Sequence, residues 1–180
     1  TRFFFGGSDA VPAPADYDGD GTCDASVFSA EAGTWSVRGM TAAFFGQSGD
    51  LPSPADYNAD GRAEFAVFRP ADGLWAILGG GRRYFGQSGD VPVPGAYCWP
   101  GDPARAAPLA EFPAVFRPVN GLWAVWGHTR LRFGMDGDSP VPGAFGGGIV
   151  DDFAVFRGSS GMWSVRGLSR WYGFTRPSRP

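Results

Sequence analysis

The chain has 180 residues, enough for one domain with a hydrophobic core, and 43% of them are hydrophobic, as in an ordinary globular protein. The formal net charge is only −3, which argues against nucleic acid as a partner. No apolar run approaches the roughly 18 residues that a membrane-spanning helix needs, so we expect no membrane insertion.

Four units of similar sequence follow one another along the chain, at approximately 4–43, 44–83, 84–131 and 132–174. Their 29 glycines and 16 prolines are spread out, which indicates turns between short elements. The excess length of the third unit falls within CWPGDPARAAPLAEFP, which we interpret as an inserted loop. The equivalent tryptophans are separated by 40, 48 and 40 residues, and we interpret them as core between units: Trp35, Trp75, Trp123 and Trp163.

Unit two illustrates the expected elements, and Asp72-Gly73 between its second and third apolar runs is a hairpin signal. No segment is long and periodic enough to predict a helix. A unit of about 40 residues with four strands buries one face only by stacking on a copy of itself, which is typical of a β-propeller. The four predicted strands of this unit are Leu51–Tyr57, Phe65–Arg69, Leu74–Leu78 and Arg83–Phe85.

The fold class that we predict is therefore all-β: a single propeller domain over residues 1–180, with four four-stranded blades of about 40 residues. A linear β-solenoid is an alternative, although its coils are usually shorter. A β-sandwich is another, although it requires no repeat of this length.

Unit one contains the acidic loop DYDGDGTCD between its first two predicted strands. Its acids occupy relative positions 1, 3, 5 and 9, and the carbonyl of Thr22 falls at position 7. This is the oxygen-ligand spacing of a calcium loop, in which glycine permits the sharp bend. The alternative is an Asp-Gly turn that binds its own backbone amides without a metal. The side chains that we predict as ligands are Asp16, Asp18, Asp20 and Asp24.

Unit two repeats the spacing with one amide in place of an acid, so we expect calcium to bind there more weakly. The corresponding residues are Asp56, Asn58, Asp60 and Glu64, with Arg62 at the backbone-ligand position. Units three and four keep almost none of these acids, so we expect no ion of this kind there. Their corresponding residues are Ala96, Cys98 and Pro100 in unit three, and Ala144, Gly146, Gly148 and Asp152 in unit four.

The sequence FGQSGDLPSPADYNADGRAEFAVFRPADGLW of unit two resembles the FG-GAP or VCBS-type repeats of integrin-like β-propellers, and all four units share the resemblance. The resemblance implies that the acidic loops of units one and two bind calcium. It also implies a secreted or cell-surface protein that serves adhesion or binding, since some members are lectins. Calcium fits this location, because weak sites fill at the high extracellular concentration.

We do not expect an enzyme. The single histidine, His128, reads as an exposed turn residue with no nucleophile and acid arranged around it. The function that we favour is a calcium-binding module for carbohydrate or a cell-surface protein. The alternative is a structural or adhesive subunit of a larger surface assembly, or a fragment of a longer propeller. Trp99, in the inserted loop, is the candidate stacking platform for a ligand.

Three further features concern assembly. Cys23 and Cys98 either form one disulfide or remain unlinked thiols. Thr1–Phe5 reads as a surplus outer strand. It either completes a blade of a neighbouring chain, pairs on unit four in place of Ser169–Tyr172, or belongs to a longer propeller; we favour donation between chains, and hence a homo-oligomer. We expect the repeated arginines to pair with acids or carbonyls of the adjacent blade: Arg69, Arg117 and Arg157.

Overall fold

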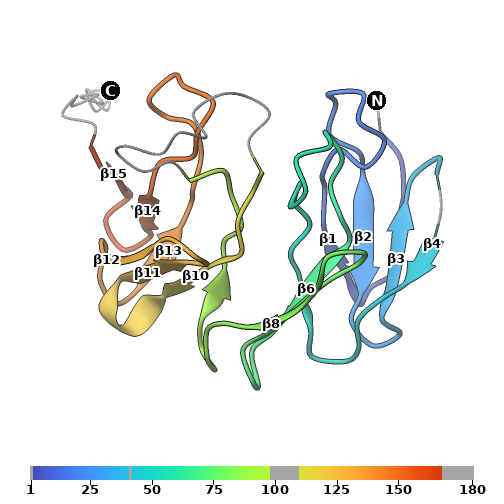
Figure 1. Cartoon of the computed structure of the whole chain (residues 1–180), viewed down its shortest axis with the longest axis horizontal. Coiled ribbons are helices and arrows are strands. Elements are labelled where there is room, and N and C mark those ends of the chain that lie inside the picture. Colours follow the sequence, from blue (N-terminus) through green and yellow to red (C-terminus); the bar gives the residue numbers. More distant parts are fainter. Residues whose placement is uncertain (1, 41, 98–109, 168–180) are drawn as a thin grey trace, which may run out of the picture.

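A computed structural model of the chain describes residues 2–40, 42–97 and 110–167. Its four antiparallel sheets are arranged in a ring as the blades of a four-bladed β-propeller (Figure 1), which confirms the predicted fold class. Each sheet contains the strands of one unit in chain order. No helix in the described part of the chain is long and apolar enough to cross a membrane.

The strand bounds follow the repeat. Blade 1 contains β1 (Ala10–Pro12), β2 (Ser26–Ser29), β3 (Thr34–Val37) and β4 (Ala42–Phe44). Blade 2 contains β5 (Leu51–Pro52), β6 (Ala66–Arg69), β7 (Leu74–Ile77) and β8 (Gly81–Tyr84). Blade 3 contains β9 (Val91–Pro92), β10 (Ala114–Arg117), the 3-10 helix η1 (Pro118–Asn120), β11 (Leu122–Val125) and β12 (Thr129–Arg132). Blade 4 contains β13 (Asp138–Pro140), β14 (Ala154–Arg157) and β15 (Met162–Val165).

The first strand of blade 2 is shorter than the sequence predicts. There β5 ends at Pro52, and the rest of the predicted strand contributes the bond from the Ser53 amide to the Ala66 carbonyl, at 2.8 Å, and the isolated bridge between Ala55 and Glu64. Proline has no amide hydrogen, so a second proline at position 54 cannot extend the ladder. At the chain ends, residues 2–5 form no strand, whereas Thr1 and Ser169–Tyr172 lie outside the described residues.

The core lies between the blades, as predicted for three of the four repeated tryptophans. Trp35, Trp75 and Trp123 are fully buried, and each indole N–H donates to a carbonyl ten residues further on, at 2.8–3.0 Å. Trp35 also lies 5.2 Å, between ring centroids, from Phe65 of blade 2. Trp163 differs, because 54% of it is exposed.

Blades 2, 3 and 4 each contain an arginine–aspartate ion pair in which the carboxylate is fully buried. In blade 2, the guanidinium of Arg69 donates to both oxygens of Asp50, at 2.7 and 3.0 Å, and the Gln47 amide donates to the same carboxylate. Arg117–Asp90 and Arg157–Asp138 repeat the pair. These acids belong to the same blade as their arginines, so the expected pairing with an adjacent blade is wrong. Each aspartate lies just before the first strand of its blade or, in blade 4, at the start of that strand, and this strand pairs directly with the arginine strand.

Candidate metal centre and axial pocket

The acidic loop of blade 1 is closed at its base by backbone pairing. The Asp24 amide donates to the Ala15 carbonyl at 2.7 Å, which brings the two ends of the loop together. Gly19 and Gly21 have φ of +78° and +82°, a region that other residues enter at a cost. The chain can therefore reverse direction twice within a few residues, which turns alternate side chains inward.

Three acids of this loop converge. Carboxylate oxygens of Asp16, Asp18 and Asp24 all lie within 4.8 Å of one another. Asp16 accepts from the Gly19 and Gly21 amides at 2.7 and 2.8 Å. Each oxygen retains a second lone pair, so these bonds leave the carboxylate able to bind a cation. The loop thus has features of both predicted structures. Its carboxylates accept from its own amides, as in an Asp-Gly turn, and they also lie close together, as in a calcium loop.

Two predicted ligands of blade 1 lie beside this group. Asp20 is not a member of the converging set; its carboxylate accepts from the Thr22 amide at 2.7 Å. Thr22 is exposed in the same turn. Calcium takes 6–8 oxygen ligands, so the three converging acids would need further oxygens, from the loop or from water.

Blade 2 gathers Asp56, Asp60 and Glu64 within the same 4.8 Å. Here the Asn58 amide nitrogen donates to Asp60 at 3.0 Å and to Glu64 at 2.7 Å, so an N–H group faces the acids. An ion would require this amide to turn and present its oxygen. Burial, and then the neighbouring acids, raise the pKa of Glu64. Arg62, at the backbone-ligand position, donates its amide to Asp60 at 2.9 Å.

Ala59 is strained where blade 1 has Gly19. Its φ is +61°, and it is the only described residue other than glycine with a positive φ. We expect Ala59→Gly to raise the free energy of unfolding by about 0.5–1 kcal/mol, because glycine removes the steric cost but adds entropy to the unfolded chain. Thermal unfolding measures the gain. An unchanged or lower melting temperature would contradict the left-handed conformation at this position.

The loops of successive blades are joined by main-chain hydrogen bonds at the centre of the ring. The amides of Ala63, Glu111 and Asp151 donate to carbonyls of the preceding blade, at 2.7, 2.7 and 3.0 Å. In addition, the carboxylate of Glu111 accepts from the Asp56 amide at 2.7 Å, and that of Asp151 from the Ala96 amide at 2.8 Å. These two acids therefore link blade 3 to blade 2 and blade 4 to blade 3.

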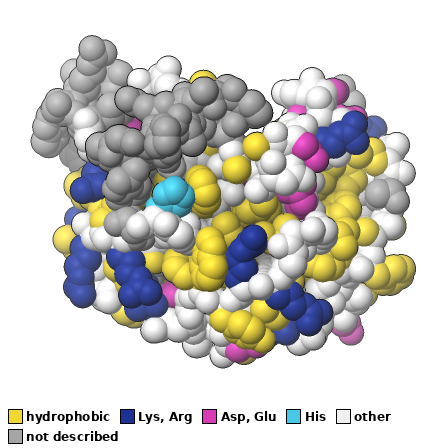
Figure 2. Space-filling model, in the orientation of Figure 1, with side chains coloured by type: hydrophobic (Ala, Val, Ile, Leu, Met, Phe, Trp, Pro, Cys, Tyr) yellow, Lys and Arg dark blue, Asp and Glu magenta, His cyan; other side chains and the backbone are white. Residues whose placement is uncertain are grey.

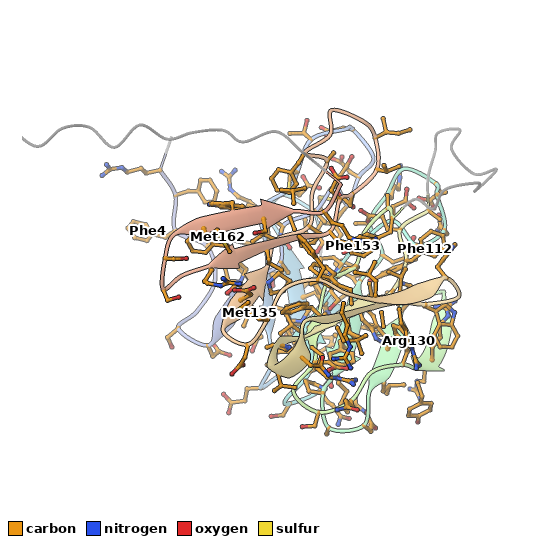
Figure 3. All side chains as sticks on the ribbon, turned by 90° about the vertical axis from the view of Figure 1, so that its left-hand side faces the viewer. Phe4, Phe112, Arg130, Met135, Phe153 and Met162 are labelled. Atoms are coloured by element: carbon orange, nitrogen blue, oxygen red, sulfur yellow. The ribbon has the colours of Figure 1, made fainter. Side chains whose placement is uncertain are left out.

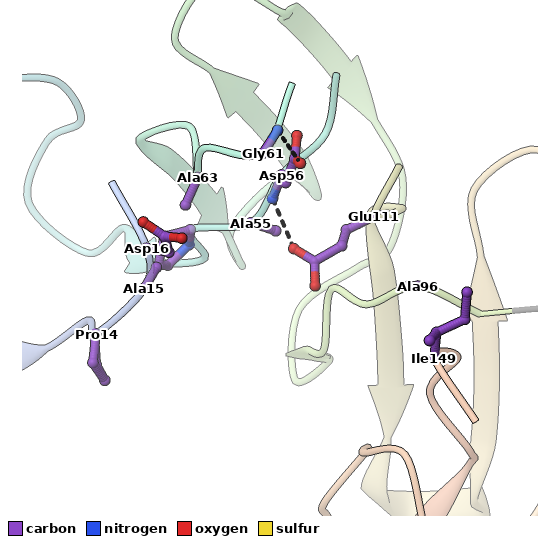
Figure 4. Close-up of a pocket in the computed structure, with 11 residues that line it drawn as sticks. Pro14, Ala15, Asp16, Ala55, Asp56, Gly61, Ala63, Ala96, Glu111 and Ile149 are labelled. Carbon is purple, nitrogen blue, oxygen red and sulfur yellow. Dashed lines mark hydrogen bonds between the residues drawn. The ribbon is translucent and has the colours of Figure 1, made fainter. Parts of the chain in front are cut away.

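A cavity of about 500 Å³ opens between these loops (Figure 4). Carboxylates of Asp16, Asp56 and Glu111 line it, and Ile149 contributes an apolar wall. Sequence reasoning missed Glu111, because the inserted loop hides the alignment of unit three. In the repeat, Glu111, just before Phe112, takes the place of Ala63, which lies one residue before the last predicted ligand of blade 2. This position beside the acidic loop was the signal that the sequence offered.

Burial, and then the charges of Asp151 and Asp56, raise the pKa of Glu111. We expect Glu111→Gln to keep or raise the melting temperature at pH 7, because the amide oxygen still accepts from Asp56 without a buried charge. Because the pKa of Glu111 is raised in the folded state, lowering the pH stabilises the folded wild type. The difference in melting temperature between wild type and Glu111→Gln should therefore shrink as pH falls through that pKa. Glu111→Ala should lower the melting temperature both at pH 7 and below that pKa, since it leaves the Asp56 amide unpaired. Equal losses for both variants would contradict this role.

The remaining predicted positions are those of Trp99, the two cysteines and His128. Trp99 and Cys98 lie outside the described residues, and Cys23 is an exposed free thiol. His128 is exposed in a turn, as expected, with its ring centroid 4.3 Å from that of Phe112. Figure 2 shows this histidine beside hydrophobic side chains on one face of the molecule.

A shallow depression of about 680 Å³ surrounds the same turn, and Trp126, which is 38% exposed, forms part of its wall. The indole meets the ring of Phe85 edge-on at 5.5 Å. Trp126 has no equivalent tryptophan in the other units. This is the sequence signal that marks it as a candidate for ligand recognition rather than for packing between blades. Sequence reasoning favoured Trp99 over it.

Comparison with known proteins adds no relative: no family model, no curated protein and no solved structure matches this chain. A functional assignment therefore depends on the geometry of the loops and of the exposed aromatic side chains.

Proposed function

We propose that the acidic loops of blades 1 and 2 bind calcium, and that the chain is a non-enzymatic binding module of the FG-GAP or VCBS type that acts outside the cell. The observation that carries the proposal is the convergence of Asp16, Asp18 and Asp24 within 4.8 Å. The ion pairs of Arg69, Arg117 and Arg157 are made with other acids, so these three arginines do not neutralise the converging carboxylates. Their mutual repulsion is then offset best by a cation.

The chemistry of the ligands favours a hard ion. The converging atoms are all carboxylate oxygens, and calcium prefers oxygen ligands in a flexible arrangement. Blade 1 presents acids at all four side-chain positions, whereas blade 2 presents an asparagine amide that must first turn. We therefore expect blade 1 to hold the ion more tightly, since ligand charge tunes calcium affinity.

Thermal unfolding with and without a chelator tests the proposal. Calcium at 100 times its dissociation constant should add about 2.7 kcal/mol to the free energy of unfolding. Asp18→Ala should remove most of that gain, because Asp18 is an exposed member of the converging set. Asp136→Ala is the matched control, since it deletes one exposed acid in blade 4, outside the loops. Identical curves for wild type with and without chelator would refute calcium binding.

The ligand class that the surface favours is carbohydrate or another group with a planar apolar face. Trp126 is partly exposed beside His128, and aromatic side chains with a polar edge are common at recognition sites. A glycan array with and without calcium would separate a lectin from a structural or adhesive subunit. Binding that depends on Trp126 supports the first, whereas an empty array under both conditions supports the second.

A further inference from the structure

Three interfaces between blades share one construction. At each, the glycine of a Phe-Gly pair lies between a phenylalanine of one blade and a valine of the next. A Cβ on Gly46 would lie 3.1 Å from Phe28 and 3.2 Å from Val67. A Cβ on Gly86 would lie 3.2 Å from both Phe68 and Val115, and one on Gly134 would lie between Phe116 and Val155. These contacts are tight, and the φ of +114°, +109° and +100° at Gly46, Gly86 and Gly134 favours glycine in addition.

In blades 1, 2 and 3, the hairpin glycine contacts the Phe-Gly pair of the following unit. The amides of Phe45, Phe85 and Phe133 donate to the carbonyls of Gly33, Gly73 and Gly121, each at 2.8 Å. A Cβ on Gly33 or Gly73 would meet the oxygen of the paired glycine at 2.5 Å, and one on Gly121 would meet it closer still. The fit is thus tight at all three hairpins.

Blade 4 presents the same surface without this cover in the described part of the chain. We call Phe156, Gly161 and Trp163 the trailing face. Phe156 and Trp163 keep the ring geometry of the buried pairs, with centroids 5.2 Å apart, yet Trp163 is 54% exposed where its equivalents are fully buried. A Cβ on Gly161 would meet no atom within 4 Å. Within the described residues, the Trp163 indole N–H has no hydrogen-bond acceptor.

Blade 1 presents the complementary surface. We call Phe5, Gly6 and Val27 the leading face. A Cβ on Gly6 would lie 3.1 Å from Val27, as at the other interfaces, but no phenylalanine of a preceding blade lies on its other side. Phe5 is 37% exposed, whereas its equivalents pack against the core clusters. In Figure 1, the N-terminal end and β15 lie at opposite sides of the molecule. The three core clusters of described residues join blades 1 and 2, blades 2 and 3, and blades 3 and 4, but none joins blade 4 to blade 1, so the ring is open there.

We infer that the leading face of one chain packs on the trailing face of a second copy. The repeat defines the contacts: the Phe5 amide donates to the Gly161 carbonyl, the Trp163 indole donates to the Phe5 carbonyl, and Gly6 lies between Phe156 and Val27. Two such contacts join two chains head to tail into a closed pair. The occupant is a second copy because the chain's own leading face lies away from blade 4, whereas the leading face of another copy carries the same Phe-Gly chemistry that covers blades 1, 2 and 3.

The solution mass of the 180-residue chain tests this interface. The wild type should have twice its chain mass of 19.1 kDa by light scattering after size exclusion. Phe5→Ser should give the monomer, because it removes the packing side chain. Phe4→Ser is the matched control: Phe4 is fully exposed and projects from the molecule (Figure 3), and its equivalent Phe44 remains exposed beside a complete interface.

A second pair of variants tests the trailing face. Gly161→Ala should give the monomer, because its methyl group would meet the incoming Gly6 carbonyl. Gly79→Ala imposes a similar backbone strain, at φ of +79°, in open space and should leave the pair intact.

Mixing Phe5→Ser with Gly161→Ala should restore a species of twice the chain mass, because each variant retains the face that the other lacks. A wild type that sediments only at 19.1 kDa would overturn the inference in favour of closure within one chain, or of cover by residues 168–180. A pair that survives both Phe5→Ser and Gly161→Ala would show that another surface joins the chains.

Discussion

Trp75→Ala is expected to lower the free energy of unfolding by about 3–5 kcal/mol, as large-to-small changes of buried aromatics do. Trp75 is fully buried between blades 2 and 3, and its indole donates to the Phe85 carbonyl at 3.0 Å. The substitution therefore leaves both a cavity and an unpaired carbonyl. Denaturant unfolding monitored by circular dichroism measures the loss.

Trp163→Ala is the control for this prediction. It occupies the same place in the repeat but is 54% exposed, so in the monomeric chain it should cost under about 1 kcal/mol. Equal losses for the two substitutions at low protein concentration would contradict the unequal burial of the four blades.

Asp90→Ala is the second change with a large expected effect. The Asp90 side chain is fully buried, accepts both donors of Arg117 and accepts from the Gln87 amide at 3.0 Å. Removing one partner of a buried pair costs about 3–5 kcal/mol, and we expect the lower end, because 22% of the Arg117 side chain is exposed. A double-mutant cycle with Arg117→Ala separates the pair energy from the loss of the Gln87 bond.

Blade 1 provides the control, since Ser29 stands in place of the arginine and Asp9, its partner, is exposed. Asp9→Ala should therefore cost far less than Asp90→Ala. In blade 4, the bond from Arg157 lowers the pKa of Asp138. The stability that this bond contributes is complete above the usual carboxyl value of about 4 and is lost as pH falls through the lowered pKa.

The repeat made the fold predictable. A tryptophan recurs at a nearly fixed spacing, as Trp35, Trp75 and Trp123, which indicates that each has similar neighbours. A structure in which each unit packs on the previous one provides such neighbours. The strands matched because Asp72-Gly73 marks a hairpin and strand-forming residues, such as Phe68 and Trp75, lie on either side of it. The first strand was predicted too long, because alternation of apolar residues does not reveal that proline ends the ladder.

The candidate loops were predictable only in part. The spacing of Asp16, Asp18 and Asp24 anticipated which acids converge, because alternate residues turn inward in such a loop. The role of Glu111 depends on a contact with blade 2 that lies 55 residues away along the chain, so local spacing could not reveal it. The orientation of the Asn58 amide likewise depends on neighbouring carboxylates rather than on position in the loop.

Calcium titration of the metal-free chain by calorimetry tests the central claim most directly. The account predicts two sites in the wild type, the tighter one being lost in Asp18→Ala and retained in Asp60→Ala, with Asp136→Ala unchanged. Loss of the tighter site in Asp60→Ala alone would show that loop geometry outweighs charge. The absence of any calcium-dependent heat at millimolar calcium, supported by equilibrium dialysis without bound ion, would contradict the account.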